Sequence, residues 1–293
     1  MLELLDSKRR AAFRFPLCAA TPMQGFTLIE LSIVLVIIGL IVGGILVGQD
    51  MIKASEIRAT VGQIEKYNSA VNTFRSKYNG IPGDLLQANA AAFGLFQMTV
   101  SPALGFGDGN GLLEGGATGA TVGMGETLAF WRHLSDANLI DGSLGTGSNG
   151  LIVAGTGLPT GDVSVMGQSL PPSKTTPAGY FIVYSVTGIN YYQLGPVNQI
   201  ASADGSYSWG TSGLTPVQAY NMDVKLDDGM PNSGSVRAKG IAAVNANASF
   251  NATSASSTCL MTGANATDTA DTYNRVTATG GNDTSCSLRF RFN

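Results

Sequence analysis

The most unusual chemistry in this sequence is a carboxylate inside an apolar segment. Residues 26–47 read FTLIELSIVLVIIGLIVGGILV, and Glu30 is the one charged residue among these 22. A carboxylate in hydrocarbon costs about 2.5–3.5 kcal/mol on membrane-insertion scales unless a partner neutralises it. Cleavage between Gly25 and Phe26 would free an amine four residues before Glu30, at a depth where the Glu30 of an adjacent copy could pair with it. The alternative is that Glu30 lies near the helix start and reaches the membrane interface.

A second group of residues could bind a hard cation. Asp108, Asn110 and Glu114 offer oxygen side chains to Ca²⁺, although Leu112 stands where a further oxygen ligand is expected. The alternative is a glycine-rich turn without an ion, in which Asp and Asn tolerate left-handed backbone. A second acidic group has the same two interpretations and comprises Asp223, Asp227 and Asp228.

Composition argues against several classes of function. The 293 residues carry a net charge of −3, and only 13% are charged, against roughly 25% in a typical soluble domain. Without a basic surface, nucleic acid is not an expected partner. One histidine and three cysteines are too few for a His-rich catalytic metal site, and a hydrolytic triad would depend on His133 alone. We therefore expect no enzyme activity and interpret His133 as a packing or surface residue.

The apolar segment 26–47 is long enough to cross a membrane. As a helix it would measure roughly 33 Å, against a bilayer core of about 30 Å. Basic residues exceed acidic ones in the first 25 residues, so the positive-inside rule places the N-terminus in the cytoplasm and the chain after residue 48 outside. No convincing small-residue cleavage site follows the apolar run, so we expect the helix to be retained. The charged residues of this N-terminal stretch are Lys8, Arg9, Arg10, Arg14, Glu3 and Asp6.

The sequence Gly25-Phe26-Thr27-Leu28-Ile29-Glu30, followed by the unbroken apolar run, resembles the processing site of type IV prepilins and type II secretion pseudopilins. The resemblance covers residues 25 to about 77. It implies that a membrane peptidase cuts after Gly25 and methylates the new N-terminal Phe26, and that Glu30 guides subunit assembly. Met23 is an alternative start to Met1 and would leave a leader of three residues.

One departure from the family concerns the outer half of the apolar helix. The proline that many members carry there is missing, and glycines lie in that half instead. Each glycine lowers helix propensity by about 1 kcal/mol relative to Ala, which would ease local melting during assembly. The glycines are Gly39, Gly43, Gly44 and Gly48.

Cysteine usage predicts a disulfide in the exported part. Cys18 lies in the leader and would be lost on processing, which leaves Cys259 and Cys286 as an even pair. Type IV pilins often have such a disulfide-closed C-terminal region, whereas the principal pseudopilins often rely on calcium. The alternative is two free thiols.

An amphipathic pattern follows the apolar segment and predicts a helix that positions the outer domain. Apolar residues recur at helical spacing up to Tyr78, and Asn79-Gly80-Ile81-Pro82-Gly83 then predicts a helix end. This face would form the surface onto which the outer domain packs. Its members are Ile57, Val61, Ile64, Tyr67, Val71, Phe74 and Tyr78.

Beyond residue 83 the sequence predicts short helices and strands between loops. Helices are expected at 84–93, at 125–139, and from Thr215-Pro216 to about Leu226. Strands are expected at 151–154, 180–186, 191–194, 236–244 and 287–292. The predicted fold class is α+β: a long N-terminal helix packed against a domain with an antiparallel sheet and a disulfide-closed C-terminal region.

These expectations define four segments and a function. The segments are a leader (1–25), a membrane-spanning assembly helix (26–48), an amphipathic stalk helix (49–79) and an extracellular pilin-like domain (80–293). The resemblance implies a structural subunit of a type IV pilus-like filament, with further copies of itself, prepilin peptidase, the inner-membrane assembly machinery and membrane lipid as partners. The precursor would cross the inner membrane once, and the assembled filament would lie on the cell surface. The alternatives are a pseudopilin of a type II secretion system, a minor pilin, or a membrane-anchored sugar-binding or enzymatic module.

Overall fold

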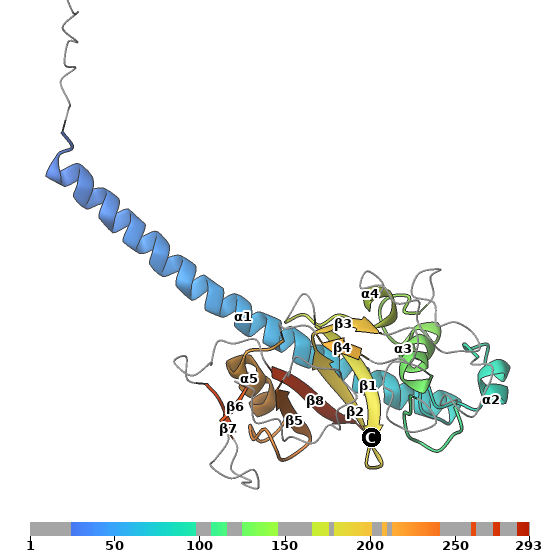
Figure 1. Cartoon of the computed structure of the whole chain (residues 1–293). Helices are drawn as coiled ribbons and strands as arrows, with labels where there is room; N and C mark the ends of the chain where they lie inside the picture. The colour runs from blue at the N-terminus through green and yellow to red at the C-terminus, as the bar shows by residue number, and fades with distance from the viewer. Residues whose placement is uncertain are drawn as a thin grey trace, which may run out of the picture. The chain divides into compact units, whose positions relative to one another are not determined.

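The computed structural model describes residues 25–97, 107–115, 125–145, 166–175, 179–200, 207–209, 213–240, 259–261, 272–275 and 286–292. The chain divides into two units, Met1–Asp50 and Met51–Asn293, which are described separately. Figure 1 shows the described elements with the labels used below.

The first unit contains the apolar part of helix α1 (Leu28–Tyr78). The large apolar side chains of this part are about half or more exposed, with Leu28 at 86% and Leu40 at 72%. The helix continues through the glycines between residues 39 and 48 without interruption. By length and composition it is able to cross a membrane.

In the second unit, the remainder of α1 buries one face of its surface. The predicted stripe is buried at every position except Val61, which is partly buried and packs against the same core. The helix ends at Tyr78, as predicted, and Asn79 follows with a left-handed φ of 53° that turns the chain away. The stripe is therefore part of the hydrophobic core of the second unit.

The main sheet of the described residues is antiparallel, with the strand order β1-β2-β8-β5. Thr187 and Gly188 join β1 to β2 in a two-residue turn, and both have positive φ, as tight hairpin turns require. Figure 1 shows the four strands side by side. The strands are β1 (Tyr180–Val186), β2 (Ile189–Gly195), β5 (Val236–Gly240) and β8 (Cys286–Phe292).

Aromatic rings from α1, α3 (Glu126–Asp136) and the sheet meet in one buried cluster. The Tyr67 ring of α1 makes edge contacts with Trp131 at 5.0 Å and with Phe181 at 5.4 Å between centroids. Tyr192 of β2 stacks on Phe292 of β8 at 4.1 Å. Such aromatic pairs stabilise the fold by about 0.5–1.5 kcal/mol each beyond the effect of their buried area. The cluster therefore holds α1, α3 and the sheet together.

The remaining elements are short. The predicted helix 215–226 is confirmed as α5 (Pro216–Leu226), where Thr215 and Gln218 form a capping box. The predicted helix 84–93 is reduced to α2 (Gln87–Ala92), and the predicted strand 151–154 lies outside the described residues. The elements that the sequence did not predict are α4 (Met166–Ser169), β3 (Val197–Ile200), β4 (Tyr207–Trp209), β6 (Leu260–Met261) and β7 (Thr272–Tyr273).

The predicted disulfide is confirmed between Cys259 and Cys286. Both cysteines are fully buried, and Cys286 begins β8, so the bond ties the segment before β6 to the main sheet. Leu214 and Cys286 also exchange two backbone hydrogen bonds of 2.9 Å.

Candidate functional site at the start of helix α1

Thr27 and Glu30 form a reciprocal cap at the start of α1. The backbone N–H and the hydroxyl of Thr27 each donate to Oε2 of Glu30 at 2.7 Å. The backbone N–H of Glu30 donates in return to Oγ1 of Thr27 at 3.3 Å. This arrangement is a capping box, which satisfies backbone donors that every helix leaves unpaired in its first turn.

The cap shows how the chain holds the carboxylate singled out in the sequence. Both donated bonds end on Oε2 of Glu30, so within the described residues Oε1 remains for a cation from outside this helix. Thr27 was missed as a functional residue at the sequence level. Its signal was present, because Thr27-Leu-Ile-Glu30 matches the capping-box pattern.

The predicted cleavage bond lies outside the helix. Gly25 and Phe26 precede α1 in an irregular segment, and the Phe26 side chain is 82% exposed. A peptidase can therefore reach this bond without unwinding α1. The structure thus places Gly25 and Phe26 directly before an apolar helix whose side chains are exposed, and Glu30 in the first turn of that helix.

A group of carboxylates lies in the second unit, near the predicted cation loop. Asp84, Asp108 and Glu126 can each bring one oxygen within 4.8 Å of the others. Asp84 accepts hydrogen bonds from Gly109 at 2.7 Å and Gly111 at 2.6 Å, which orders the loop around it. Burial raises the pKa of Asp84 to about 6 and that of Glu126 to about 9.

The other residues predicted for this loop have different roles. The amide of Asn110 is used inside the loop, because Oδ1 accepts from Leu112 N–H and Nδ2 donates to Asp108. Glu114 contributes its backbone N–H, which donates to Glu126 Oε2 at 2.8 Å. Calcium at Asp108, Asn110 and Glu114 stays a prediction. Asp84 and Glu126 join this group only through the fold, since each is distant from the loop in sequence.

The acidic group Asp223, Asp227 and Asp228 is held by donors from its own chain. Asp223 is buried and accepts a hydrogen bond of 2.7 Å from the Tyr273 hydroxyl and one of 3.2 Å from Gly229 N–H. Asp227 caps the start of β5 by accepting from backbone N–H groups there. These contacts fit the interpretation as helix-end and turn residues. The three residues can also each bring one oxygen within 4.8 Å of the others, so a metal ion at this group stays a prediction.

His133 is a buried packing residue, which confirms one of the two interpretations drawn from the sequence. It is 1% exposed, and its ring stacks on Phe74 of α1 at 6.0 Å between centroids. Gly83 N–H donates to Nδ1 at 2.9 Å, and Nε2 lies 2.7 Å from the Phe96 carbonyl oxygen. Both ring nitrogens are engaged by backbone, so neither is available to a substrate.

The start of α1 therefore combines a capped carboxylate with an exposed apolar helix that is able to cross a membrane. The family model described as the prokaryotic N-terminal methylation motif matches residues 22–46. With the long apolar helix, this match fits the type IV pilin and pseudopilin family. The motif indicates a structural protein with an inner-membrane anchor in its precursor form. No curated protein and no solved structure matches the chain.

Proposed function

We propose that this protein is a structural subunit of an extracellular type IV pilus-like filament, processed after Gly25 and polymerised through the first half of α1. The observation that carries the proposal is the apolar part of α1, residues 28–47, which is exposed along its length and has Glu30 at its first turn. Such a helix needs an apolar environment along its whole surface.

Two environments meet that need at successive stages. Before assembly the bilayer surrounds the helix, whose length and composition allow it to span the membrane. Outside the membrane, the abundant apolar surface that remains is the same helix in other copies. Burying one Val, Leu or Ile side chain contributes about 1.5–3 kcal/mol, so bundling of these helices strongly favours assembly.

A pairing of opposite charges would fix how neighbouring helices align in the assembly. After cleavage, the free amine of Phe26 meets the Glu30 carboxylate of a neighbouring copy, whose Oε1 is not used by the Thr27 cap. A contact of this kind, repeated head to tail without closure, generates a helical polymer. The partners are prepilin peptidase, the inner-membrane assembly machinery and, before assembly, lipid.

The test combines N-terminal mass spectrometry with electron microscopy of sheared cell surfaces. A Gly25→Val variant is expected to remain an uncut membrane precursor without filaments. Gly167→Val is the matched control, because an added Cβ has nothing within 4 Å at either glycine and Gly167 is exposed and lies outside α1. Normal filaments from the Gly25 variant, or a mature chain that starts elsewhere than Phe26, would contradict the proposal.

The abundance of the chain in those filaments separates the two roles within the family. Filaments composed mainly of this chain support a pilus subunit. Processing at Phe26 with the chain present only in trace amounts, or only in a secretion complex, would show a minor pilin or a pseudopilin instead.

A further inference from the structure

We propose that His133 is an acid-sensitive switch that holds the segment 81–96 against α3 when its ring is neutral and releases the segment when its ring is protonated. This inference concerns the second unit alone and does not depend on the proposed filament.

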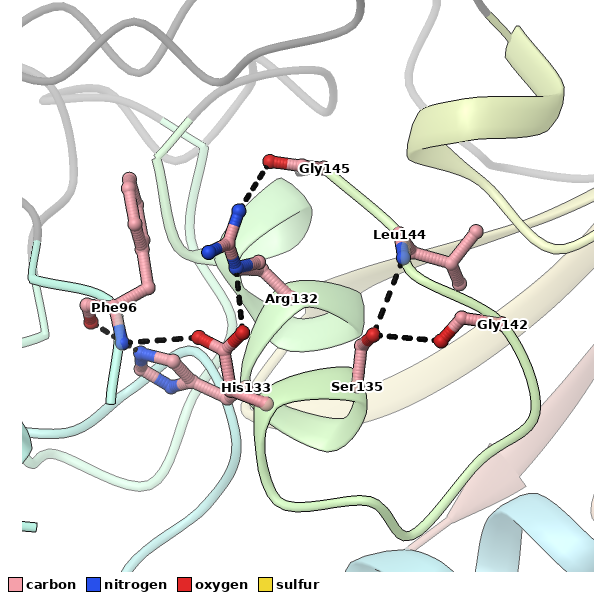
Figure 2. A network of polar contacts seen from close by, with 8 residues as sticks. Phe96, Arg132, His133, Ser135, Gly142, Leu144 and Gly145 are labelled. Carbon is pink, nitrogen blue, oxygen red and sulfur yellow. Dashed lines mark hydrogen bonds and ion pairs between the residues drawn. The ribbon is translucent and has the colours of Figure 1, made fainter. Parts of the chain in front are cut away.

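The hydrogen bonds fix the form of the imidazole. Gly83 N–H is a donor, so Nδ1 must present its lone pair and carry no proton. The ring proton of the neutral form is then on Nε2, which donates it to the Phe96 carbonyl oxygen. One neutral ring therefore binds both ends of the segment 81–96, and Figure 2 shows the contact at Phe96.

Protonation removes one of these two bonds. A proton on Nδ1 would face the N–H of Gly83, donor against donor, and would place a positive charge in a site that is 1% exposed. Burial lowers the pKa of His133, and this effect exceeds the opposing effects of the Phe96 hydrogen bond and of Asp136.

The charges around the ring are already occupied. Asp136 of α3 accepts from Arg132 Nε at 2.8 Å and from Phe96 N–H at 3.1 Å. From α1 the neighbour is the Phe74 ring, which carries no charge. On the segment itself, the Asp84 carboxylate accepts from Gly109 and Gly111, and burial raises its pKa to about 6. Its protonation below pH 6 therefore favours the closed segment and opposes the effect of His133.

The sign of the pH dependence follows from these pKa values. An opened segment returns His133 toward its ordinary pKa of 6.5, whereas the closed state holds the pKa below that value. At His133 the open state binds more protons below pH 6.5, so this residue increases the opening equilibrium by up to about tenfold per pH unit until its closed-state pKa is reached. Above pH 6.5 the contact is fully formed.

Opening would expose a defined apolar surface. Leu85 and Leu95 of this segment are each 5% exposed, and Phe93 makes an edge contact of 5.0 Å with Tyr78 at the end of α1. Acid release of the segment would therefore uncover the last turn of the α1 stripe while the main sheet stays formed.

The test is amide hydrogen exchange of the full mature chain in detergent micelles between pH 8 and pH 4, corrected for intrinsic exchange rates. Exchange of residues 83–96 in the wild type, divided by exchange in His133→Gln, is expected to rise by up to about tenfold per pH unit below 6.5. His133→Gln keeps only the opposing titration of Asp84, and Asp136→Asn is expected to retain the response of the wild type.

A second readout needs no variant. His133 is the one histidine of the sequence, so its imidazole NMR signals report this ring alone. Nδ1 is expected to be unprotonated at pH 8, and ring protonation to coincide with the loss of protection. The proposal is overturned if the wild type and His133→Gln give the same pH profile, if the ring is protonated without release of residues 83–96, or if Nδ1 carries a proton at pH 8.

Discussion

Glu126 places a carboxyl group at the start of α3 with an exposed fraction of only 1%. Burial raises its pKa to about 9, so the folded state holds a proton that the unfolded state releases near 4.5. The unfolded state therefore binds fewer protons between pH 4.5 and pH 9, and folding stability falls as pH rises through this window.

This behaviour gives the first prediction. In EDTA, the melting temperature of the wild type is expected to decrease between pH 5 and pH 9, and Glu126→Gln to reduce that decrease and raise the melting temperature at pH 8. An increase in the melting temperature at pH 8 on addition of calcium, present in the wild type and lost in Glu126→Gln, would show that a cation replaces the proton. An identical pH profile in both proteins would show that Glu126 is not the titrating group.

Residue-scale features were predicted from the sequence to different degrees. Glu30 was identified because a charge within 22 apolar residues is conspicuous without any fold. Asp84 and Glu126 were not, since a carboxylate that meets Asp108 only through tertiary packing leaves no local pattern. The two hydrogen bonds of His133 were missed for the same reason, although its packing role was among the expectations.

At the scale of elements, the two parts of α1 differ in composition and in exposure: the first part is apolar and exposed, and the second is amphipathic with one buried face. In its apolar part Ile38 is 51% exposed, whereas Phe74 in its amphipathic part is completely buried. The two parts are therefore expected to respond differently to truncation, because loss of a buried ring leaves a cavity in a packed core.

The second prediction follows from this difference. Phe74→Ala is expected to lower the unfolding free energy of the outer domain by about 3–5 kcal/mol. Ile38→Ala is the control and is expected to change it by less than about 0.5 kcal/mol. Denaturant unfolding in detergent, followed by near-ultraviolet circular dichroism, measures both. Equal effects of the two substitutions would contradict the assignment of the stripe as core.

Elements with strong local signals were predicted well. Helix α5 begins after Thr215 and ends at Leu226, as its cap and proline indicated, and strand β1 matches the predicted residues 180–186. Strands of two to four residues were not predicted. Elements such as β6 (Leu260–Met261) are too short to show the alternation of apolar and polar residues that indicates a strand. They are recognised as strands only by their pairing with another segment of the chain.

For the whole molecule, the disulfide constrains a segment with little apolar content of its own. Cys259 and Cys286 are separated by 27 residues, and closing a loop of that length contributes roughly 3–4 kcal/mol in the chain-entropy model. The bond also ties this loop to β8, where Cys286 lies opposite Gly240 of β5.

The third prediction concerns this bond. Replacing both Cys259 and Cys286 with Ala is expected to lower the unfolding free energy by about 3–4 kcal/mol and to raise proteolytic cleavage between residues 259 and 286. Cys18→Ala in the precursor is the matched control and should leave both unchanged. Unaltered stability in the double variant would show that packing alone holds the loop.

The position of β8 between β2 and β5 has a consequence for biogenesis. Its neighbours come roughly 50 to 100 residues earlier in the sequence, so no four-stranded sheet exists until β8 has been synthesised. Pairings so distant along the polypeptide form slowly, because a large loop must close before any contact rewards it. The β1–β2 hairpin therefore has an unpaired edge until β8 arrives, and during this interval the chain is most prone to pair with another chain.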